Sequence, residues 1–290
     1  MVGEYTKMNG INILKASVVL GFLLLLPYVN VEAGEHKSLG IPRTQIVPIQ
    51  DTKSNRQYDL YIKLPEDYEK NTDQKYPVIY MTDGDYQMDL LSGTTEFLMP
   101  NAILVGISWE KDSEGNETRG SRLRDYTLIE YETIEGPTGE ASNYLSFIRG
   151  NIIKHVESNF RTKANERAYL GYSSGAEFGA YTLLAEPDTF QYYLLGSPAL
   201  DKLSTKYLDE LEAETAQKQK ALNTNVFLSI AEQERPGRLD LTKDFVTVLK
   251  RRTEAGLSLT GLTIIQGDHS SAVPETFLRG IKWLSQKISE

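Results

Sequence analysis

The sequence lacks cysteine altogether and contains only three histidines among its 290 residues. The absence of cysteine excludes a thiol nucleophile, a cysteine–zinc site and any disulfide. An excess of basic charge is also missing, because the net charge is −9, and this argues against a nucleic-acid-binding surface. With 40% hydrophobic and 24% charged residues, the composition is that of a globular protein large enough to bury a core without disulfides.

A hydrophobic run long enough to cross a membrane is missing too. The apolar run at residues 16–26 has about 11 residues, whereas a membrane-spanning helix needs about 20. The run follows two lysines, and a Val-Glu-Ala sequence that ends at Ala33 fits the rule for signal cleavage. We therefore expect residues 1–33 to be a secretory signal peptide and residues 34–290 to be a periplasmic or secreted protein. An uncleaved membrane anchor is the alternative.

The pattern of apolar residues predicts one α/β domain over residues 34–290. Apolar and polar residues alternate over 44–50 and 57–64, which is typical of half-buried antiparallel strands. From residue 77 on, predicted strands alternate with predicted helices, which is the signature of a mainly parallel sheet with helices on both faces. Together these features predict the α/β-hydrolase fold. The strands are expected at 77–81, 102–108, 168–170, 190–196, 226–230 and 257–265, the helices at 143–160, 202–222, 239–255 and 274–288, and a long irregular segment from Trp109 to about Glu140.

The functional interpretation depends on a motif within residues 166–183. A short apolar run is followed by Gly171-Tyr-Ser-Ser-Gly175, which has the form G-x-S-x-G, and then by small and apolar residues at helical spacing. A strand, a sharp turn and a helix in this order form a nucleophile elbow, in which the serine hydroxyl stands clear of the sheet. Ser173 is therefore the candidate nucleophile, and the start of the following helix favours negative charge beside it.

A serine nucleophile needs a base that accepts its proton, and only three histidines are available. His36 lies at the expected start of the mature chain, and His155 lies within a predicted helix. His269 follows the last predicted strand, at the kind of strand end where sites collect in open α/β sheets. The order serine, acid, histidine is also the order of α/β hydrolases. His269 is therefore the candidate base.

The acid that orients this histidine is expected after the strand 226–230. Glu232 and Glu234 both follow this strand, and Asp240 is a weaker third candidate. The spacing alone does not choose between the two glutamates. The alternative is that both are solvated loop residues and that the histidine acts without an acid.

Backbone donors are also needed for the negative charge that develops on the substrate oxygen. The N–H of Ser174 is one candidate, and the turn after the strand 77–81 should supply the other from Gly84 or Asp85. Asp83, in the same turn, is expected to hold it through its own backbone.

Seven segments resemble the putative esterase family of α/β hydrolases, which includes siderophore esterases, feruloyl and acetyl-xylan esterases, S-formylglutathione hydrolases and mycolyltransferases. The similarity extends from about Gln57 to Trp283. The segments are Pro77-Val-Ile-Tyr-Met-Thr-Asp-Gly84, Arg122-Leu-Arg-Asp-Tyr-Thr127, the helix from Phe147 to Phe160, Gly171-Tyr-Ser-Ser-Gly175, Gly196-Ser-Pro198, Ile230-Ala-Glu-Gln-Glu234 and Gly267-Asp-His269.

The resemblance implies an esterase with Ser173 as nucleophile, His269 as base and Glu234 as acid, and so it favours the second of the two glutamates. The sequence departs from the family at Ala176 and Ala231, where glycine is common. No metal motif accompanies the resemblance, and we expect no cofactor. The expected enzyme is a secreted or periplasmic serine esterase that acts through an acyl-enzyme.

The substrate is expected to be a small-molecule or carbohydrate-linked ester. Arginines at 119, 122 and 124 could attract an acidic substrate such as a catecholate siderophore, or they could pair with Asp125, Glu130 and Glu132. Tyr172, Arg122 and Arg124 are the candidate substrate-binding residues. A feruloyl or acetyl ester on a polysaccharide is the second substrate class. An acyltransferase and a non-catalytic binding domain on the same scaffold are the alternative functions.

Overall fold

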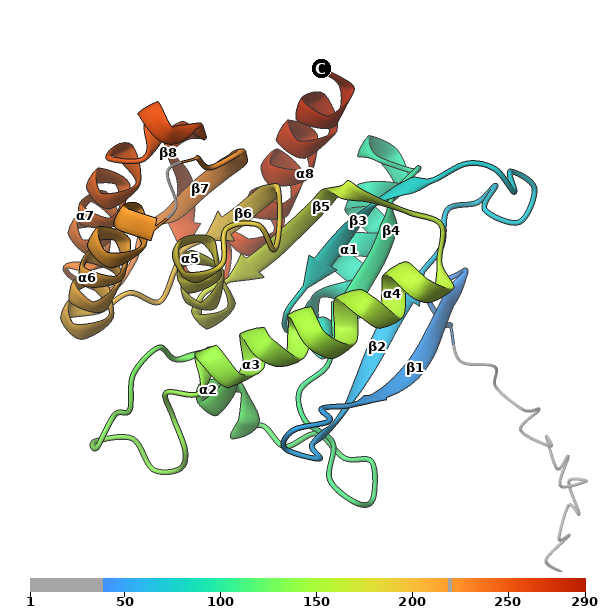
Figure 1. Cartoon of the computed structure of the whole chain (residues 1–290), viewed down its shortest axis with the longest axis horizontal. Helices are drawn as coiled ribbons and strands as arrows, with labels where there is room; N and C mark the ends of the chain where they lie inside the picture. The colour runs from blue at the N-terminus through green and yellow to red at the C-terminus, as the bar shows by residue number, and fades with distance from the viewer. Residues whose placement is uncertain (1–38, 219–220) are drawn as a thin grey trace, which may run out of the picture. The chain divides into compact units, whose positions relative to one another are not determined.

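An eight-stranded sheet forms the centre of the protein in the computed structural model, which describes residues 39–218 and 221–290 (Figure 1). The strand order is β1-β2-β4-β3-β5-β6-β7-β8. The first two neighbouring pairs, β1 with β2 and β2 with β4, are antiparallel, and all other pairs are parallel. This is the α/β-hydrolase architecture that the sequence predicts. The strands are β1 Thr44–Gln50, β2 Gln57–Lys63, β3 Tyr76–Met81, β4 Ile103–Ile107, β5 Thr162–Tyr172, β6 Tyr192–Gly196, β7 Thr224–Gln233 and β8 Leu257–Asp268.

Helices cover both faces of the sheet, as Figure 1 shows. One face packs against α1 and α8, and the other against α3 to α7. Alternate side chains of β3 serve the two faces, since Val78 and Tyr80 join one core and Ile79 and Met81 join the other. The helices are α1 Gly84–Leu98, α2 Ser121–Tyr126, α3 Ala141–Phe147, α4 Ile153–Asn159, α5 Ser174–Ala185, α6 Lys202–Lys218, α7 Arg238–Lys250 and α8 Val273–Ser289, with a π-helical turn η1 Ile148–Ile152 and a 3₁₀ turn η2 Thr253–Ala255.

Three helical features differ from the sequence prediction. Helix α1, which carries Gly84 and Asp85 at its start, was not anticipated. The predicted irregular segment from Trp109 to Glu140 contains the short helix α2. The predicted single helix 143–160 is α3 and α4 joined by the π-helical turn η1, so its register changes in the middle. A short helix that is buried through charged side chains has no apolar stripe, and one extra residue in a helical turn barely changes the spacing of apolar residues. Hydrophobic periodicity therefore detects neither feature.

The strand order reverses direction between β3 and β5, at the centre of the sheet. The chain passes from β3 to β4 on one side and later adds β5 on the other side. In open α/β sheets, ligands bind outside the carboxyl ends of the strands at such a switch point. Three non-glycine residues with positive φ lie within two residues of these ends: Asp83 with φ 59°, Ser173 with φ 58° and Ser197 with φ 41°. Backbone strain of this kind concentrates at functional sites.

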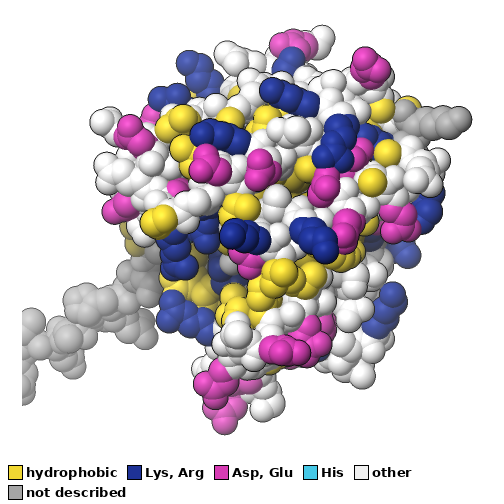
Figure 2. Space-filling view, turned by 90° about the vertical axis from the view of Figure 1, so that its left-hand side faces the viewer, with side chains coloured by type: hydrophobic (Ala, Val, Ile, Leu, Met, Phe, Trp, Pro, Cys, Tyr) yellow, Lys and Arg dark blue, Asp and Glu magenta, His cyan; other side chains and the backbone are white. Residues whose placement is uncertain are grey.

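The surface carries both signs of charge. Figure 2 looks onto the side where α6 and α7 lie and shows Lys and Arg side chains interspersed with Asp and Glu side chains. Among the described helices, none combines the length and the apolar character that crossing a bilayer requires. The predicted signal peptide, residues 1–33, lies outside the described residues.

Candidate active site

Ser173 lies at the turn between β5 and α5, as the G-x-S-x-G motif predicts. Its φ of 58° and ψ of −121° describe a strained backbone that neighbouring strands hold in place. The Ser173 N–H donates to the carbonyl of Gly196 at 2.9 Å, and its carbonyl accepts from the N–H groups of Glu177 and Ala199 at 3.0 Å each. Ser173, which is half-buried, thereby joins the end of β5 to the end of β6 and to the first turn of α5.

Gly175 allows the first turn of α5 to pack directly against the end of β3. A Cβ at this position would collide with the hydroxyl of Thr82. The hydroxyl of Tyr169 lies 3.0 Å from that of Thr82 and donates to the carbonyl of Gly175 at 2.6 Å. The start of α5 and the turn after β3 are therefore held in contact, as a site shared between them requires.

His269 and Glu234 are in direct contact. Nδ1 of His269 lies 2.5 Å from Oε1 of Glu234, and the glutamate side chain is 2% exposed, whereas that of the histidine is 36% exposed. Arg238 lies 3.4 Å from Oε2 of the same glutamate. A buried carboxylate on Nδ1 fixes the imidazole so that Nε2 is free for a substrate or a nucleophile.

The loop that carries His269 lies beside the elbow. The hydroxyl of Tyr172, the residue before Ser173, donates to the carbonyl of His269 at 2.7 Å, and the two rings are 5.2 Å apart. Burial raises the pKa of Tyr172 to about 12, so its hydroxyl remains a donor. The carboxylate of Asp268 accepts the N–H groups of Ser270 and Ser271 and so fixes the turn. Tyr172 thus contacts the histidine loop, whereas the sequence analysis offered it as a substrate-binding residue.

The other candidate acids and bases lie elsewhere. Glu232 is exposed, and the Asp240 side chain is 79% exposed and pairs with Lys243 at 3.2 Å. His155 is a half-buried residue of α4, and His36 lies outside the described residues. The structure therefore brings only Glu234, of the three candidate acids, to His269.

The turn between β3 and α1 is held by two buried carboxylates. Asp83 accepts the indole N–H of Trp109 at 2.8 Å and both Nε and Nη2 of Arg122, at 2.7 and 2.8 Å. Asp85 accepts the N–H of Trp109 at 2.7 Å and the Tyr61 hydroxyl at 2.5 Å. The Asp83 carbonyl also accepts the N–H groups of Tyr86 and Gln87 at 3.0 and 3.1 Å, so Asp83 holds the turn through its own backbone, as expected, and through its side chain as well.

Two helices begin where this turn meets the elbow. The N–H groups of Gly84 and Asp85 open α1, and that of Ser174 opens α5. The first amides of a helix have no acceptor within it, and the helix dipole adds partial positive charge there. Gly84 is required by packing as well, because a Cβ would lie 2.8 Å from the carbonyl carbon of Gly106 in β4.

Two of the arginines offered as substrate-binding residues are engaged in ion pairs. Arg122 binds both oxygens of Asp83 and, although burial opposes its charge, this pairing raises its pKa. Arg124, whose side chain is 8% exposed, binds Asp125 at 2.8 Å and Glu110 at 2.6 Å. The pairing of Arg124 with Asp125 is the alternative to substrate binding that the sequence analysis named. The burial of the Arg124 side chain also argues against a substrate-binding role for it.

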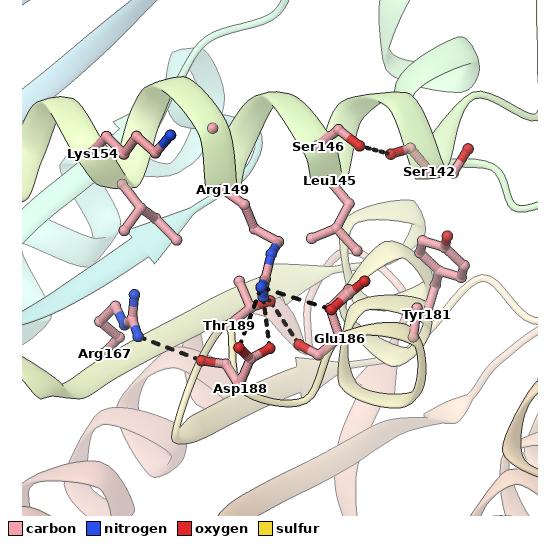
Figure 3. Close-up of a pocket in the computed structure, with 13 residues that line it drawn as sticks. Ser142, Leu145, Ser146, Arg149, Lys154, Arg167, Tyr181, Glu186, Asp188 and Thr189 are labelled. Carbon is pink, nitrogen blue, oxygen red and sulfur yellow. Dashed lines mark hydrogen bonds and ion pairs between the residues drawn. The ribbon is translucent and has the colours of Figure 1, made fainter. Parts of the chain in front are cut away.

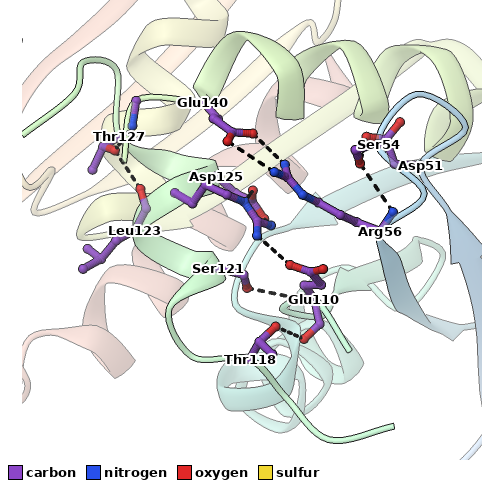
Figure 4. A network of polar contacts seen from close by, with 12 residues as sticks. Asp51, Ser54, Arg56, Glu110, Thr118, Ser121, Leu123, Asp125, Thr127 and Glu140 are labelled. Carbon is purple, nitrogen blue, oxygen red and sulfur yellow. Dashed lines mark hydrogen bonds and ion pairs between the residues drawn. The ribbon is translucent and has the colours of Figure 1, made fainter. Parts of the chain in front are cut away.

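The polar network around Arg124 anchors the segment between α2 and α3. Figure 4 shows Glu110 with Ser121, and Arg56 with Glu140, which pair at 2.6 Å. The N–H of Glu140 also donates to the carbonyl of Arg124 at 2.9 Å. Both ends of this segment are thereby fixed to the body of the domain.

A pocket of about 560 Å³ opens beside the β3–α1 turn. Arg119 lies over the aromatic rings of Tyr86 and Trp109, with 5.9 and 6.0 Å from its guanidinium carbon to the ring centroids. Asp83 and Arg122 also line the pocket. The walls therefore combine two aromatic faces with the guanidinium group of Arg119, which forms no ion pair with another described residue. The sequence analysis noted Arg119 only as one of three neighbouring arginines.

A second pocket, of about 550 Å³, lies between α3–α4 and the connection from α5 to β6 (Figure 3). Arg149 pairs there with Asp188 at 2.7 Å and lies 3.7 Å from Glu186. Asp188 and Thr189 precede β6, so they lie near the amino ends of the parallel strands, whereas Ser173 lies at their carboxyl ends. Within the described residues, no group of three or more His, Asp or Glu side chains is placed to hold a metal ion.

The sheet order and the helices on both faces define an α/β-hydrolase fold. The putative esterase family matches residues 52–262, and the chain belongs to this family. It is 22% identical over 272 residues to the ferri-bacillibactin esterase BesA of Bacillus subtilis (strain 168), which covers 86% of this chain and 92% of the relative. Family and fold together indicate an esterase.

Solved structures agree on the fold. The BES protein from Bacillus cereus has a TM-score of 0.73 at 22% identity, covering 86% of this chain and 97% of that one. The siderophore hydrolase EstA from Aspergillus nidulans has a TM-score of 0.67 at 18% identity, covering 87% and 98%. Because the fold extends over nearly the full length of both proteins, the site described here lies within the shared architecture.

Proposed function

We propose that this chain is a serine carboxylic-ester hydrolase in which Ser173 is the nucleophile, His269 the general base and Glu234 the acid that orients it. The observation that carries the proposal is the 2.5 Å contact between His269 Nδ1 and Glu234 Oε1, on a loop that Tyr172 ties to the strained elbow. A serine, a buried carboxylate and a histidine, in this order along the chain, are the components of serine esterase chemistry.

The proposed reaction has two halves. Ser173 Oγ attacks the ester carbonyl while His269 Nε2 takes its proton, and the imidazolium then gives that proton to the oxygen of the leaving alcohol. Water next attacks the acyl-enzyme, His269 takes one proton of the water, and that proton returns to Ser173 as the acid leaves. Glu234 stabilises the imidazolium in both halves.

The negative oxygen of each tetrahedral intermediate is proposed to lie between the starts of α5 and α1. The N–H of Ser174 is one donor, and the N–H of Gly84 or Asp85 is the other. Support comes from the contact between Gly175 and Thr82, which holds the two helix starts together. Fixed donors of this kind each contribute about 3 kcal/mol to transition-state stabilisation.

The test replaces the nucleophile. Ser173→Ala should lower kcat/KM for an activated p-nitrophenyl ester by about 10⁴-fold or more. Ser146→Ala is the matched control and should keep full activity, because Ser146 lies in α3 and is half-buried, as Ser173 is. A fluorophosphonate should label the wild type at Ser173 and leave the alanine variant unlabelled. Full activity of Ser173→Ala would contradict the mechanism, and failure to label would favour a non-catalytic binding domain.

We propose a siderophore-type ester, with an acidic aromatic group, as the substrate. Two relatives are named a ferri-bacillibactin esterase and a siderophore hydrolase. The pocket beside the β3–α1 turn supports this class, because Tyr86 and Trp109 can stack on an aromatic ring while Arg119 binds its negative charge. Arg122 contributes by holding Asp83 at the wall of this pocket.

Substrate profiling separates this class from the others. Purified enzyme should hydrolyse a tri-catecholate lactone with a higher kcat/KM than feruloyl or acetyl esters of carbohydrates. Preference for the carbohydrate esters would move the assignment to a polysaccharide esterase. Acyl transfer to an added alcohol in preference to water would identify an acyltransferase. Export is a further proposal from the sequence, and N-terminal sequencing of the mature protein should find Gly34 as its first residue.

A further inference from the structure

Ser197, the residue directly after β6, has a backbone conformation that is strained for a serine. Its φ of 41° lies in the left-handed region, and the residue is 0% exposed. A glycine would adopt this φ without strain, so the backbone gives no reason for a serine here. The proposed mechanism gives Ser197 no role either. The hydroxyl group is therefore the feature of this position that needs an explanation.

The turn at Ser197 wraps around the nucleophile elbow. The carbonyl of Gly196, just before it, accepts the N–H of Ser173 at 2.9 Å. The N–H of Ala199, just after it, donates to the carbonyl of Ser173 at 3.0 Å. The chain turns between these two contacts, at the residue with positive φ. One short turn thus binds both backbone groups of the proposed nucleophile.

The Ser197 hydroxyl extends the sheet beyond the end of β6. The N–H of Ser197 donates to the carbonyl of Ser229 in β7 at 2.8 Å. In a regular parallel pair, the carbonyl of Ser197 would then accept the N–H of Ala231. Instead, the Ala231 N–H donates to Oγ of Ser197 at 2.9 Å. The side chain thus fixes β7 at the residue where its pairing with β8 begins to change register, three residues before Glu234.

The same hydroxyl group is joined to the histidine loop through Tyr172. Burial raises the pKa of Tyr172, and the hydrogen bond that Ser197 donates to its oxygen opposes this rise. Tyr172 in turn donates to the carbonyl of His269 at 2.7 Å. The ring packs on Gly196, where a Cβ would lie 2.5 Å from it. The hydrogen bonds therefore form one directed chain, from the N–H of Ala231 through two hydroxyl groups to the histidine loop.

We propose that Ser197 is a positioning residue whose hydroxyl group holds Glu234 and His269 in place relative to Ser173. The inference rests on the proposed esterase function and concerns how that site is kept aligned. The acid follows the β7 residue that donates to the hydroxyl, and the histidine loop is bound through Tyr172. The turn that carries the hydroxyl binds the nucleophile. One buried side chain thus joins the three segments of the site.

Loss of this hydroxyl should slow the chemical step more than it weakens substrate binding. It would leave the Ala231 N–H without its acceptor, and the end of β7 that leads to Glu234 would gain freedom. A misplacement of about 1 Å near a reacting centre can cost about 10²-fold in rate. Ser197 has no exposed surface with which to contact a substrate, so KM should change little.

The experiment compares two replacements of Ser197. Ser197→Gly removes the hydroxyl and relieves the strained φ, whereas Ser197→Ala removes the hydroxyl and keeps the strain. The control is Thr182→Val, which removes a buried hydroxyl that bonds the carbonyl of Phe178 at 3.0 Å within α5. The measured quantities are kcat and KM for an activated p-nitrophenyl ester, the rate of fluorophosphonate labelling at Ser173, and the melting temperature.

Both variants should lose about tenfold or more in kcat and in labelling rate, with KM within about twofold of the wild type. Ser197→Gly should melt at a higher temperature than Ser197→Ala. A merely structural role would make the loss of kcat follow the loss of melting temperature. Thr182→Val should keep the kcat of the wild type, whatever its melting temperature.

A double-mutant cycle with the acid completes the test. In a Glu234→Gln background, Ser197→Gly should cost roughly threefold or less, because the acid through which it acts is already lost. Wild-type kcat in Ser197→Gly, or its full effect in the Glu234→Gln background, would overturn this inference and leave the esterase function standing. Absence of labelling at Ser173 in the wild type would overturn the esterase function itself, and this inference with it.

Discussion

The buried carboxyl group of Glu177 should make the stability of the wild type fall as pH rises, and Glu177→Gln should remove this dependence. The folded protein holds the proton of Glu177 up to about pH 8, whereas the unfolded chain releases it near the ordinary value of 4.5. The unfolded state therefore binds fewer protons between these pH values. Stability falls across this window and is level above it, because both states are then ionised.

The size of the effect follows from the two pKa values. The rise from 4.5 to about 8 corresponds to about 5 kcal/mol, since one pKa unit is worth about 1.4 kcal/mol. Between pH 5 and pH 8, the free energy of unfolding of the wild type should fall by about 3.5 kcal/mol relative to the glutamine variant. Asp201, Tyr131, Arg122 and Arg238 face Glu177 in both proteins, so their own titration largely cancels in the difference.

Urea unfolding, followed by tryptophan fluorescence at pH 5, 6, 7, 8 and 9, measures this difference. Glu135→Gln serves as the control, because an exposed glutamate should give no pH-dependent difference from the wild type. A difference between wild type and Glu177→Gln that stays constant from pH 5 to pH 8 would refute the reasoning. Such a result would mean that Glu177 is ionised in the folded protein and has a cationic partner.

Two further predictions concern the proposed site. Glu234→Gln should lower kcat/KM by about 10²-fold or more because the imidazolium loses its carboxylate, while Glu232→Gln, an exposed glutamate two residues away, should match the wild type; equal losses would contradict the assignment of the acid. Arg119→Met should raise KM for a catecholate ester about tenfold or more and leave a neutral acetyl ester unaffected; an equal effect on both esters would remove Arg119 from substrate binding.

The sheet and the elbow could be predicted from the sequence because both are encoded locally. Alternating and continuous apolar runs marked the strands, and the glycines around Ser173 marked the turn. The β1 strand has the predicted bounds, 44–50, and β5 extends on both sides of the predicted run 168–170.

Helix α2 and the role of Asp83 depend on contacts that are distant in the sequence. Arg124 and Asp125 are buried in α2 by pairing with each other and with Glu110 and Tyr58, so no apolar stripe marks this helix. Asp83 finds its partners 26 and 39 residues away, in Trp109 and Arg122. From the sequence alone, a run of charged residues looks like a solvated loop, because the partners that bury these charges are distant in the chain. For this reason the sequence predicted an irregular segment from Trp109 to about Glu140.

The choice between Glu232 and Glu234 shows how a sheet selects one of two equivalent residues. In a regular strand, residues two apart point to the same side, so the sequence cannot separate them. The pairing of β7 with β8 changes register between Ala231 and Gln233, and it resumes with Gln233 opposite Asp268. Glu234 and His269 are the first residues after the two strands, so the last pair of the ladder, Gln233 with Asp268, brings them side by side. The acid that contacts the histidine is therefore determined by one irregularity in strand pairing, and a change that restored regular pairing there should separate the two side chains without altering either residue.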